Sequence, residues 1–231
     1  MRMKHFYTAV GRFERKTNEY GLSRPIIILG GKEYMVDLQE MVIWTCLNWR
    51  IVKKDEIAIL YEKACQGNVF LSERSLDSCI DRLLMRGLLV SGTGETDYDA
   101  LYDLLSALYI IPTSGGMPLR LFTFYKLVLL DHIPVAAAKK LLVKDKRTPR
   151  EELIMHLARQ ALLSCAEIIK CMEKDLKHLP NEESILENLY DDRDTTSENI
   201  GCMVKTAPSS KAVTIAIANL YLRQQIIFER I

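Results

Sequence analysis

The stretch from Ser72 to Val90, SERSLDSCIDRLLMRGLLV, constrains the fold most, because it combines a helix start, a helix stop and a strand. The hydroxyl of Ser72 is predicted to cap the helix, since it can accept hydrogen bonds from the free N–H groups of the first turn. Gly87 follows the last apolar position, and a glycine in the left-handed conformation ends a helix at little cost. The apolar helix positions are Leu76, Cys79, Ile80, Leu83 and Leu84, and the strand continues through Leu88, Leu89 and Val90.

The opposite face of this predicted helix is polar and carries charges of both signs. Arginine and serine side chains can contact base edges and phosphates, whereas carboxylates repel phosphates. The face therefore has groups suited to nucleic acid together with groups that oppose it. Its polar residues are Arg74, Ser75, Ser78 and Arg82, with Glu73, Asp77 and Asp81 between them.

Further helices and a hairpin surround this stretch. Residues 25–36, PIIILGGKEYMV, predict a hairpin, because Gly30 and Gly31 allow the positive φ angles of a tight turn. Asp37 is predicted to cap a helix that runs to about Trp49, and residues 54–65 predict a second helix. Residues 97–108 have the spacing of a further helix. Three helices, a glycine and a strand thus follow one another.

This order of elements resembles the winged-helix group of bacterial transcription regulators, over roughly residues 37–96. The resemblance implies that the third helix enters the major groove of duplex DNA and that residues 91–96 form the wing. Winged helices also serve as protein-docking modules, so an interaction function stays open. The implied DNA-contacting residues are Lys53, Lys54, Arg74, Ser75, Ser78 and Arg82.

Two basic segments add to the possible phosphate contacts. Residues 1–24 hold six basic groups against two acids, which predicts either a phosphate-binding arm or a loosely ordered, solubilising terminus. Residues 139–150 hold six basic groups against one acid and form either a phosphate contact or a solvated turn. Because the formal net charge of the whole chain is only +1, any attraction to nucleic acid must come from such local patches.

The sequence PTSGGMP at residues 112–118 predicts a domain boundary. We expect an N-terminal domain of residues 1–111, with the arm, the hairpin and the winged helix, and a helical C-terminal domain of residues 117–231. Residues 119–130 are strongly apolar and are interpreted as core or a dimer face rather than a cofactor pocket. Thr148, followed by Pro149 and Glu151, predicts the start of a long helix that runs to about Leu179.

A weak internal repeat relates the opening stretch to the end of the chain at an offset of 137 residues. The second copy would be a winged-helix-like unit within residues 181–231, and its exposed Lys211 joins the candidate DNA-binding residues. The alternative is chance, because any helix followed by a strand shares this periodicity. The repeat pairs Ser72 with Ser209, Leu76 with Val213, Ile80 with Ile217, Leu83 with Leu220, Arg86 with Arg223, and Leu89 and Val90 with Ile226 and Ile227.

Catalytic and metal-binding motifs are missing from the sequence. There is no GxxxxGK[ST] loop, no GxGxxG after a strand, no HExxH and no GxSxG. The six cysteines contain no CxxC pair, and the four histidines are scattered, so we expect reduced core thiols and no metal site. These features predict a protein that is not an enzyme and has no cofactor. The apolar runs are too short to span a bilayer and no signal peptide is evident, which favours the cytoplasm without membrane attachment.

The combined expectation is a mainly α protein with small β-hairpins, a winged helix-turn-helix N-terminal domain and a helical C-terminal domain. Its expected function is a dimeric transcription regulator that binds double-stranded DNA, with an effector left unspecified. One alternative is a replication or partition protein with tandem winged helices, in which Lys205 and Lys211 would share a face with Arg74 and Arg82. The other is an interaction module in which Asp77 and Asp81 contact a partner protein.

Overall fold

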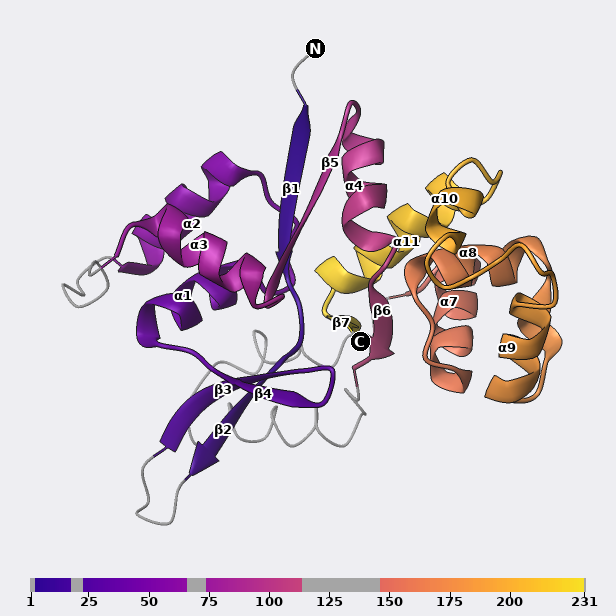
Figure 1. Ribbon diagram of the computed structural model, residues 1–231, viewed down its shortest axis with the longest axis horizontal. Coiled ribbons are helices and arrows are strands. Elements are labelled where there is room, and N and C mark those ends of the chain that lie inside the picture. The colour runs from indigo at the N-terminus through magenta and orange to yellow at the C-terminus, as the bar shows by residue number, and fades with distance from the viewer. Residues whose placement is uncertain (1–2, 18–22, 66–73, 114–145, 231) are drawn as a thin grey trace.

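The computed structural model describes residues 3–17, 23–65, 74–113 and 146–230. About half of the described residues are helical and about a fifth lie in strands, which form three small antiparallel sheets within this part of the chain (Figure 1). The expectation of a mainly α protein built on a winged helix is therefore wrong, since the fold is mixed α and β. The predicted Ser72 cap, the apolar segment 119–130 and most of the basic segment 139–150 lie outside the described residues.

The N-terminal elements follow several of the local predictions. The hairpin turns at Gly30 and Gly31, whose φ angles are 56° and 73°. Asp37 caps the next helix in a capping box with Glu40. Both predictions are confirmed. The elements are β1 (Lys4–Ala9), β2 (Arg12–Thr17), β3 (Ser23–Leu29), β4 (Lys32–Met35), α1 (Leu38–Leu47), α2 (Lys54–Cys65), α3 (Leu76–Met85), β5 (Leu89–Gly94), α4 (Asp97–Leu105) and β6 (Tyr109–Pro112).

The expected basic arm is wrong, because its residues form two strands. β1 pairs with β5, and β2 joins β3 and β4 in a three-stranded sheet. Gly11 separates the two strands with a φ of 84°, and its N–H donates to the carbonyl of Phe228 at 2.8 Å. Thr8 and Ala9 at the end of β1 point to opposite faces of the strand and are both buried, so this end of the strand is part of the core. The basic residues of β2, which are Arg12, Arg15 and Lys16, are all exposed, so their charge indicated an arm and not a strand.

The predicted wing is also wrong. Residues 89–94 pair with β1 along their whole length, from Leu89 with Ala9 to Gly94 with Lys4, and Thr96 then caps α4. The glycines of this segment serve close packing instead of a turn. A Cβ atom on Gly92 would lie 2.3 Å from the backbone nitrogen of Leu104, so α4 rests directly on the strand.

Helix α3 ends as predicted, and its N-cap lies three residues after the predicted Ser72. Ser75 is its N-cap and accepts from the N–H of Ser78 at 3.3 Å. At the other end, Arg86 is the C-cap and Gly87 is left-handed, with a φ of 71°. The N–H of Leu88 then donates to Leu83, which closes the last turn as in a Schellman motif.

The C-terminal elements begin as predicted but divide the expected long helix. Thr148 caps α7 in a capping box with Glu151, which confirms the predicted start. The chain becomes extended at Ala161, and Ser164 caps a new helix through a second capping box, so a continuous helix to Leu179 is wrong. The elements are α7 (Pro149–Gln160), α8 (Cys165–Glu173), η3 (Leu176–His178), α9 (Glu182–Leu189), α10 (Ile200–Val204), α11 (Ser210–Leu222) and β7 (Ile226–Glu229).

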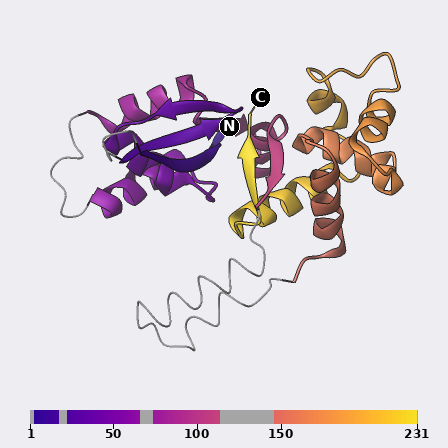
Figure 2. The same cartoon turned by 90° about the horizontal axis from the view of Figure 1, so that it is seen from below.

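The corner between helix and strand recurs at the offset of 137 residues. Gln224 stands where Gly87 stands in the first copy and is also left-handed, with a φ of 59°. Its N–H donates to Tyr221, and the N–H of Gln225 donates to Leu220, which repeats the bonds that close α3. Each strand that follows pairs antiparallel with an earlier strand, β5 with β1 and β7 with β6. In Figure 2, the sheet of β6 and β7 lies between the N-terminal elements and the C-terminal helices.

A buried lysine anchors the end of α8. The side chain of Lys170 is 9% exposed, and its Nζ lies 2.7 Å from Oδ2 of Asp192 and also contacts the hydroxyl of Thr195. The hydrogen bond from Lys170 is the main cause that holds the pKa of Asp192 well below its ordinary value of 3.8. The charged carboxylate is thus the form that the folded protein favours.

We expect Asp192→Asn to destabilise the protein near neutral pH but to matter less in acid. Because the folded-state pKa is lowered, the contribution of Asp192 is fully present above pH 3.8 and is lost as the pH falls below this value. Urea midpoints at pH 6 and pH 3 should therefore differ less in the variant than in the wild type. Asp194→Asn, at an exposed position nearby, is the matched control and should keep the wild-type difference. An unchanged pH dependence in Asp192→Asn would contradict the prediction.

Candidate nucleic-acid interface

Two arginines predicted to contact DNA, Arg74 just before α3 and Arg82 within it, pair with acids at the start of α1. Arg74 forms an ion pair with Asp37. Arg82 places Nε 2.9 Å from Oε1 of Glu40, and Arg86 places Nη1 2.9 Å from Oε2 of the same carboxylate. The side chain of Glu40 is only 1% exposed, so it needs these cations as partners. The arginines thus hold α3 against α1.

The ionisation of Asp37 supports this structural role. Partial burial alone would raise its pKa, but the backbone N–H of Glu40 and the guanidinium of Arg74 outweigh that effect and lower the pKa. Asp37 therefore remains charged and keeps Arg74 in place.

The other predicted residues divide into two groups. Ser75 and Ser78 are at the start of α3, where Ser75 caps the helix, and Lys54 is paired with Asp77 of α3 at 2.9 Å. Lys53 immediately precedes α2. Lys211 lies elsewhere, because α11 is on the other side of β1 and β5 from α3 (Figure 1). The Nζ atom of Lys211 is 5.9 Å from the ring centre of Tyr98 in α4.

The tandem alternative required Lys205 and Lys211 to share a face with Arg74 and Arg82. Lys205 is 3.3 Å from Asp99, so both lysines pack against α4, whereas both arginines pack against α1. The described contacts therefore do not join these four residues into one surface.

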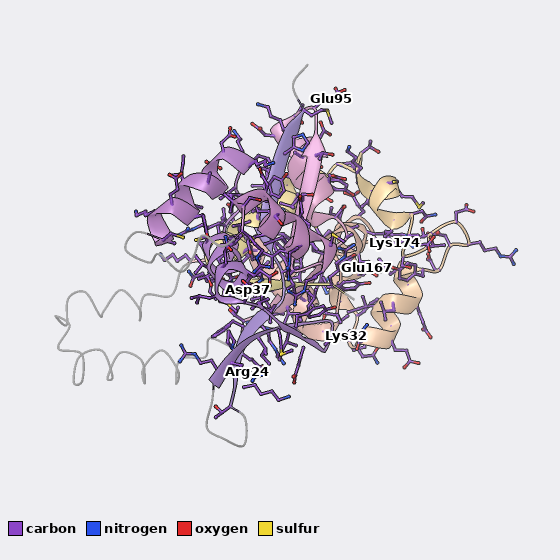
Figure 3. All side chains as sticks on the ribbon, turned by 60° about the vertical axis from the view of Figure 1, so that its left-hand side comes forward. Arg24, Lys32, Asp37, Glu95, Glu167 and Lys174 are labelled. Atoms are coloured by element: carbon purple, nitrogen blue, oxygen red, sulfur yellow. The ribbon has the colours of Figure 1, made fainter. Side chains whose placement is uncertain are left out.

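A second basic surface lies on the sheet of β2, β3 and β4, which we name the basic ribbon. Lys16 and Arg24 are directly opposite each other near its end, where Arg24 projects (Figure 3). The ribbon was missed from the sequence because its first half was interpreted as an arm and its second half as a simple hairpin. Its exposed basic residues are Arg12, Arg15, Lys16, Arg24 and Lys32, against the two acids Glu14 and Glu33.

The charges of the ribbon are largely available to a ligand. Arg15, Arg24 and Lys32 form no ion pair with any described residue. Lys16 is 2.8 Å from Glu33, but both side chains are about half exposed. Such surface pairs contribute little to stability, so a phosphate can replace the carboxylate at small cost. The ribbon therefore offers more accessible positive charge than the α3 face.

The part of the chain that the structure describes holds no group of three or more histidine, cysteine, aspartate or glutamate residues arranged to bind a metal ion. The six cysteines are free, and Cys79, Cys165 and Cys171 are buried. Among the described helices, none combines the length and apolar character that crossing a bilayer demands.

Comparison of the chain with models of protein families, with curated proteins and with solved structures found no match. The function of the protein must therefore be inferred from the geometry of the basic ribbon and of α3.

Proposed function

We propose that the protein is a DNA-binding regulator that contacts the backbone of duplex DNA through the basic ribbon. The observation that carries this proposal is the excess of exposed basic residues on β2, β3 and β4, five against two acids. Lysine and arginine side chains supply most of the sequence-independent affinity for DNA, because they release counterions from the phosphates. Near Lys16 and Arg24 only β2 and β3 are paired, because β4 pairs with β3 from Ile26 onward. A two-stranded antiparallel ribbon has a width that the major groove accepts.

The α3 face has a smaller part in this proposal. Contacts from Arg74 or Arg82 to phosphate would require that they leave Asp37 or Glu40, and the nearly buried Glu40 would then lose a cation. Asp77 and Asp81 on the same face would also repel phosphates. Among the other candidates, Lys53 forms no ion pair with any described residue.

The proposal includes a homodimer and a cytoplasmic location. A dimer fits the two-fold symmetry of most regulatory DNA sites. The cytoplasm fits the buried thiols of Cys79, Cys165 and Cys171, which stay reduced there.

The double variant Lys16→Ala/Arg24→Ala should bind random duplex DNA about 10- to 100-fold more weakly than the wild type at low salt. The slope of log affinity against log salt concentration should fall by about 2, because two phosphate contacts are lost. Fluorescence anisotropy of a labelled duplex at several salt concentrations measures both quantities. Neither residue belongs to the core, so the fold should persist.

Two control variants sharpen this test. Arg159→Ala/Arg193→Ala removes the same charge from exposed positions of the C-terminal part and should change affinity by less than about threefold. In the Arg74→Ala/Arg82→Ala variant, the free energy of unfolding should fall, whereas the affinity for DNA should change little. If the Arg159/Arg193 variant lost as much DNA affinity as the Lys16/Arg24 variant, the loss would be explained by net charge alone. That result would contradict a ribbon contact. No binding of the wild type at low salt would overturn the proposal and favour a protein-interaction module.

A further inference from the structure

An open cleft of about 750 Å³ lies between the basic ribbon, α1 and β7. Small-molecule sites in proteins typically have volumes of about 300–1,000 Å³ and mainly apolar walls. The walls of this cleft are mainly apolar, and β2, β3, helix α1 and the strand β7 each contribute residues to them. Its apolar wall residues include Phe13, Pro25, Leu38, Met41 and Ile227.

The inner wall of the cleft contains Trp44 and Trp49, which are the only two tryptophans of the chain. The indole N–H of Trp44 donates to the carbonyl of Val10 at 3.1 Å, and that of Trp49 donates to Ile226 at 3.2 Å. The backbone N–H of Trp49 also donates to the hydroxyl of Tyr221 at 2.9 Å. These hydrogen bonds hold both indoles in place. Trp44 is only 2% exposed, whereas Trp49 is partly exposed, so Trp49 provides more of the accessible apolar surface of this wall.

The charged side chains among the described residues of the cleft walls are all basic. Arg12 and Arg15 line it, and no acidic residue is among the described residues of its walls. Arg12 is 3.3 Å from Glu14, whereas Arg15 forms no ion pair with any described residue. A guanidinium beside an apolar wall is complementary to a carboxylate that has a hydrocarbon body, because it supplies two parallel donors.

We propose that this cleft binds a small amphipathic carboxylate, with its hydrocarbon part against Trp44, Trp49 and Met41 and its carboxylate on Arg15. This inference goes beyond the proposed DNA contact and does not depend on it. Residues Lys16 and Arg24, which carry the DNA contact, are not among the described residues that line the cleft.

Titration of the full chain with dodecanoate tests the proposal, with tryptophan emission as the readout. Dodecanoate does not absorb at the excitation wavelength, so a saturable change in emission reports contact with the indole wall. Dodecanol, which has the same chain without the charge, should bind about tenfold more weakly. Arg15→Ala should weaken dodecanoate by a similar factor and leave dodecanol unchanged.

Glutamate substitutions at two exposed helix positions, one that lines the cleft and one that does not, test whether dodecanoate binds in the cleft. Leu38, at the mouth of the cleft, is 60% exposed and begins α1, where an acid is tolerated, while Met85 on α3 is 87% exposed and does not line the cleft. Leu38→Glu should weaken dodecanoate about tenfold or more, and Met85→Glu should have no effect. No emission change at saturating dodecanoate, equal binding of dodecanol, or equal effects of the two glutamates would each overturn the proposal. These titrations contain no DNA, so their failure leaves the ribbon contact standing.

Discussion

Replacement of Tyr221 by phenylalanine is expected to lower the free energy of unfolding by about 2–4 kcal/mol. The side-chain hydroxyl accepts from Oγ1 of Thr8 at 2.8 Å and from the backbone N–H of Trp49 at 2.9 Å, and it donates to the carbonyl of Ala9 at 3.0 Å. Burial raises the pKa of Tyr221 to about 12, so the hydroxyl keeps its proton at all working pH values. Phenylalanine leaves these three groups without the hydroxyl that they bond, and each such buried group costs about 1–3 kcal/mol.

Urea unfolding, followed by tryptophan fluorescence and by circular dichroism, measures this effect. Tyr98→Phe is the matched control, because it also removes one hydroxyl, which is 2.8 Å from Oγ of the Ser210 side chain and only partly buried. Its expected cost is below about 1 kcal/mol. If the two variants lost similar free energies of unfolding, the Tyr221 hydroxyl would not be a bond that ties α11 to β1 and to the end of α1.

Gly92→Ala is expected to destabilise the protein by about 3–5 kcal/mol, or to prevent folding. The new Cβ atom would lie 2.3 Å from the backbone nitrogen of Leu104 and 2.4 Å from the carbonyl oxygen of Ala100. Both are backbone atoms of α4, which cannot rotate away as a flexible side chain would. The variant must therefore separate α4 from β5, and the contact of β5 with β1 would weaken with it.

Thermal unfolding followed by circular dichroism should show a fall in Tm of about 10 °C or more for Gly92→Ala. Gly201→Ala is the control, since its Cβ atom would meet nothing closer than 3.9 Å and the residue lies in α10. Alanine is the better helix former, so this change should be neutral or stabilising by up to about 1 kcal/mol. A Gly92→Ala protein as stable as the wild type would contradict the packing of α4 on β5.

The candidate site was only partly accessible from the sequence. The polar residues of α3 were found, but their partners were not, because Arg82 and Glu40 are 42 residues apart and meet only when α3 packs on α1. The basic ribbon was missed although its residues were counted. Basic side chains on a strand and on an arm look alike in the sequence, and only pairing of β2 with β3 distinguishes them.

The sequence by itself determined the ends of many elements. Asp37, Thr148, the two glycines of the hairpin and Gly87 each act on hydrogen bonds or φ angles within about four residues, so neighbouring letters suffice to predict them. Tertiary structure alone decided the sheets, the packing of α4 on Gly92 and the ion pairs of α3. Those features join residues that are far apart in the chain. Their free energy depends on which surfaces are buried together, and local periodicity does not specify which surfaces meet.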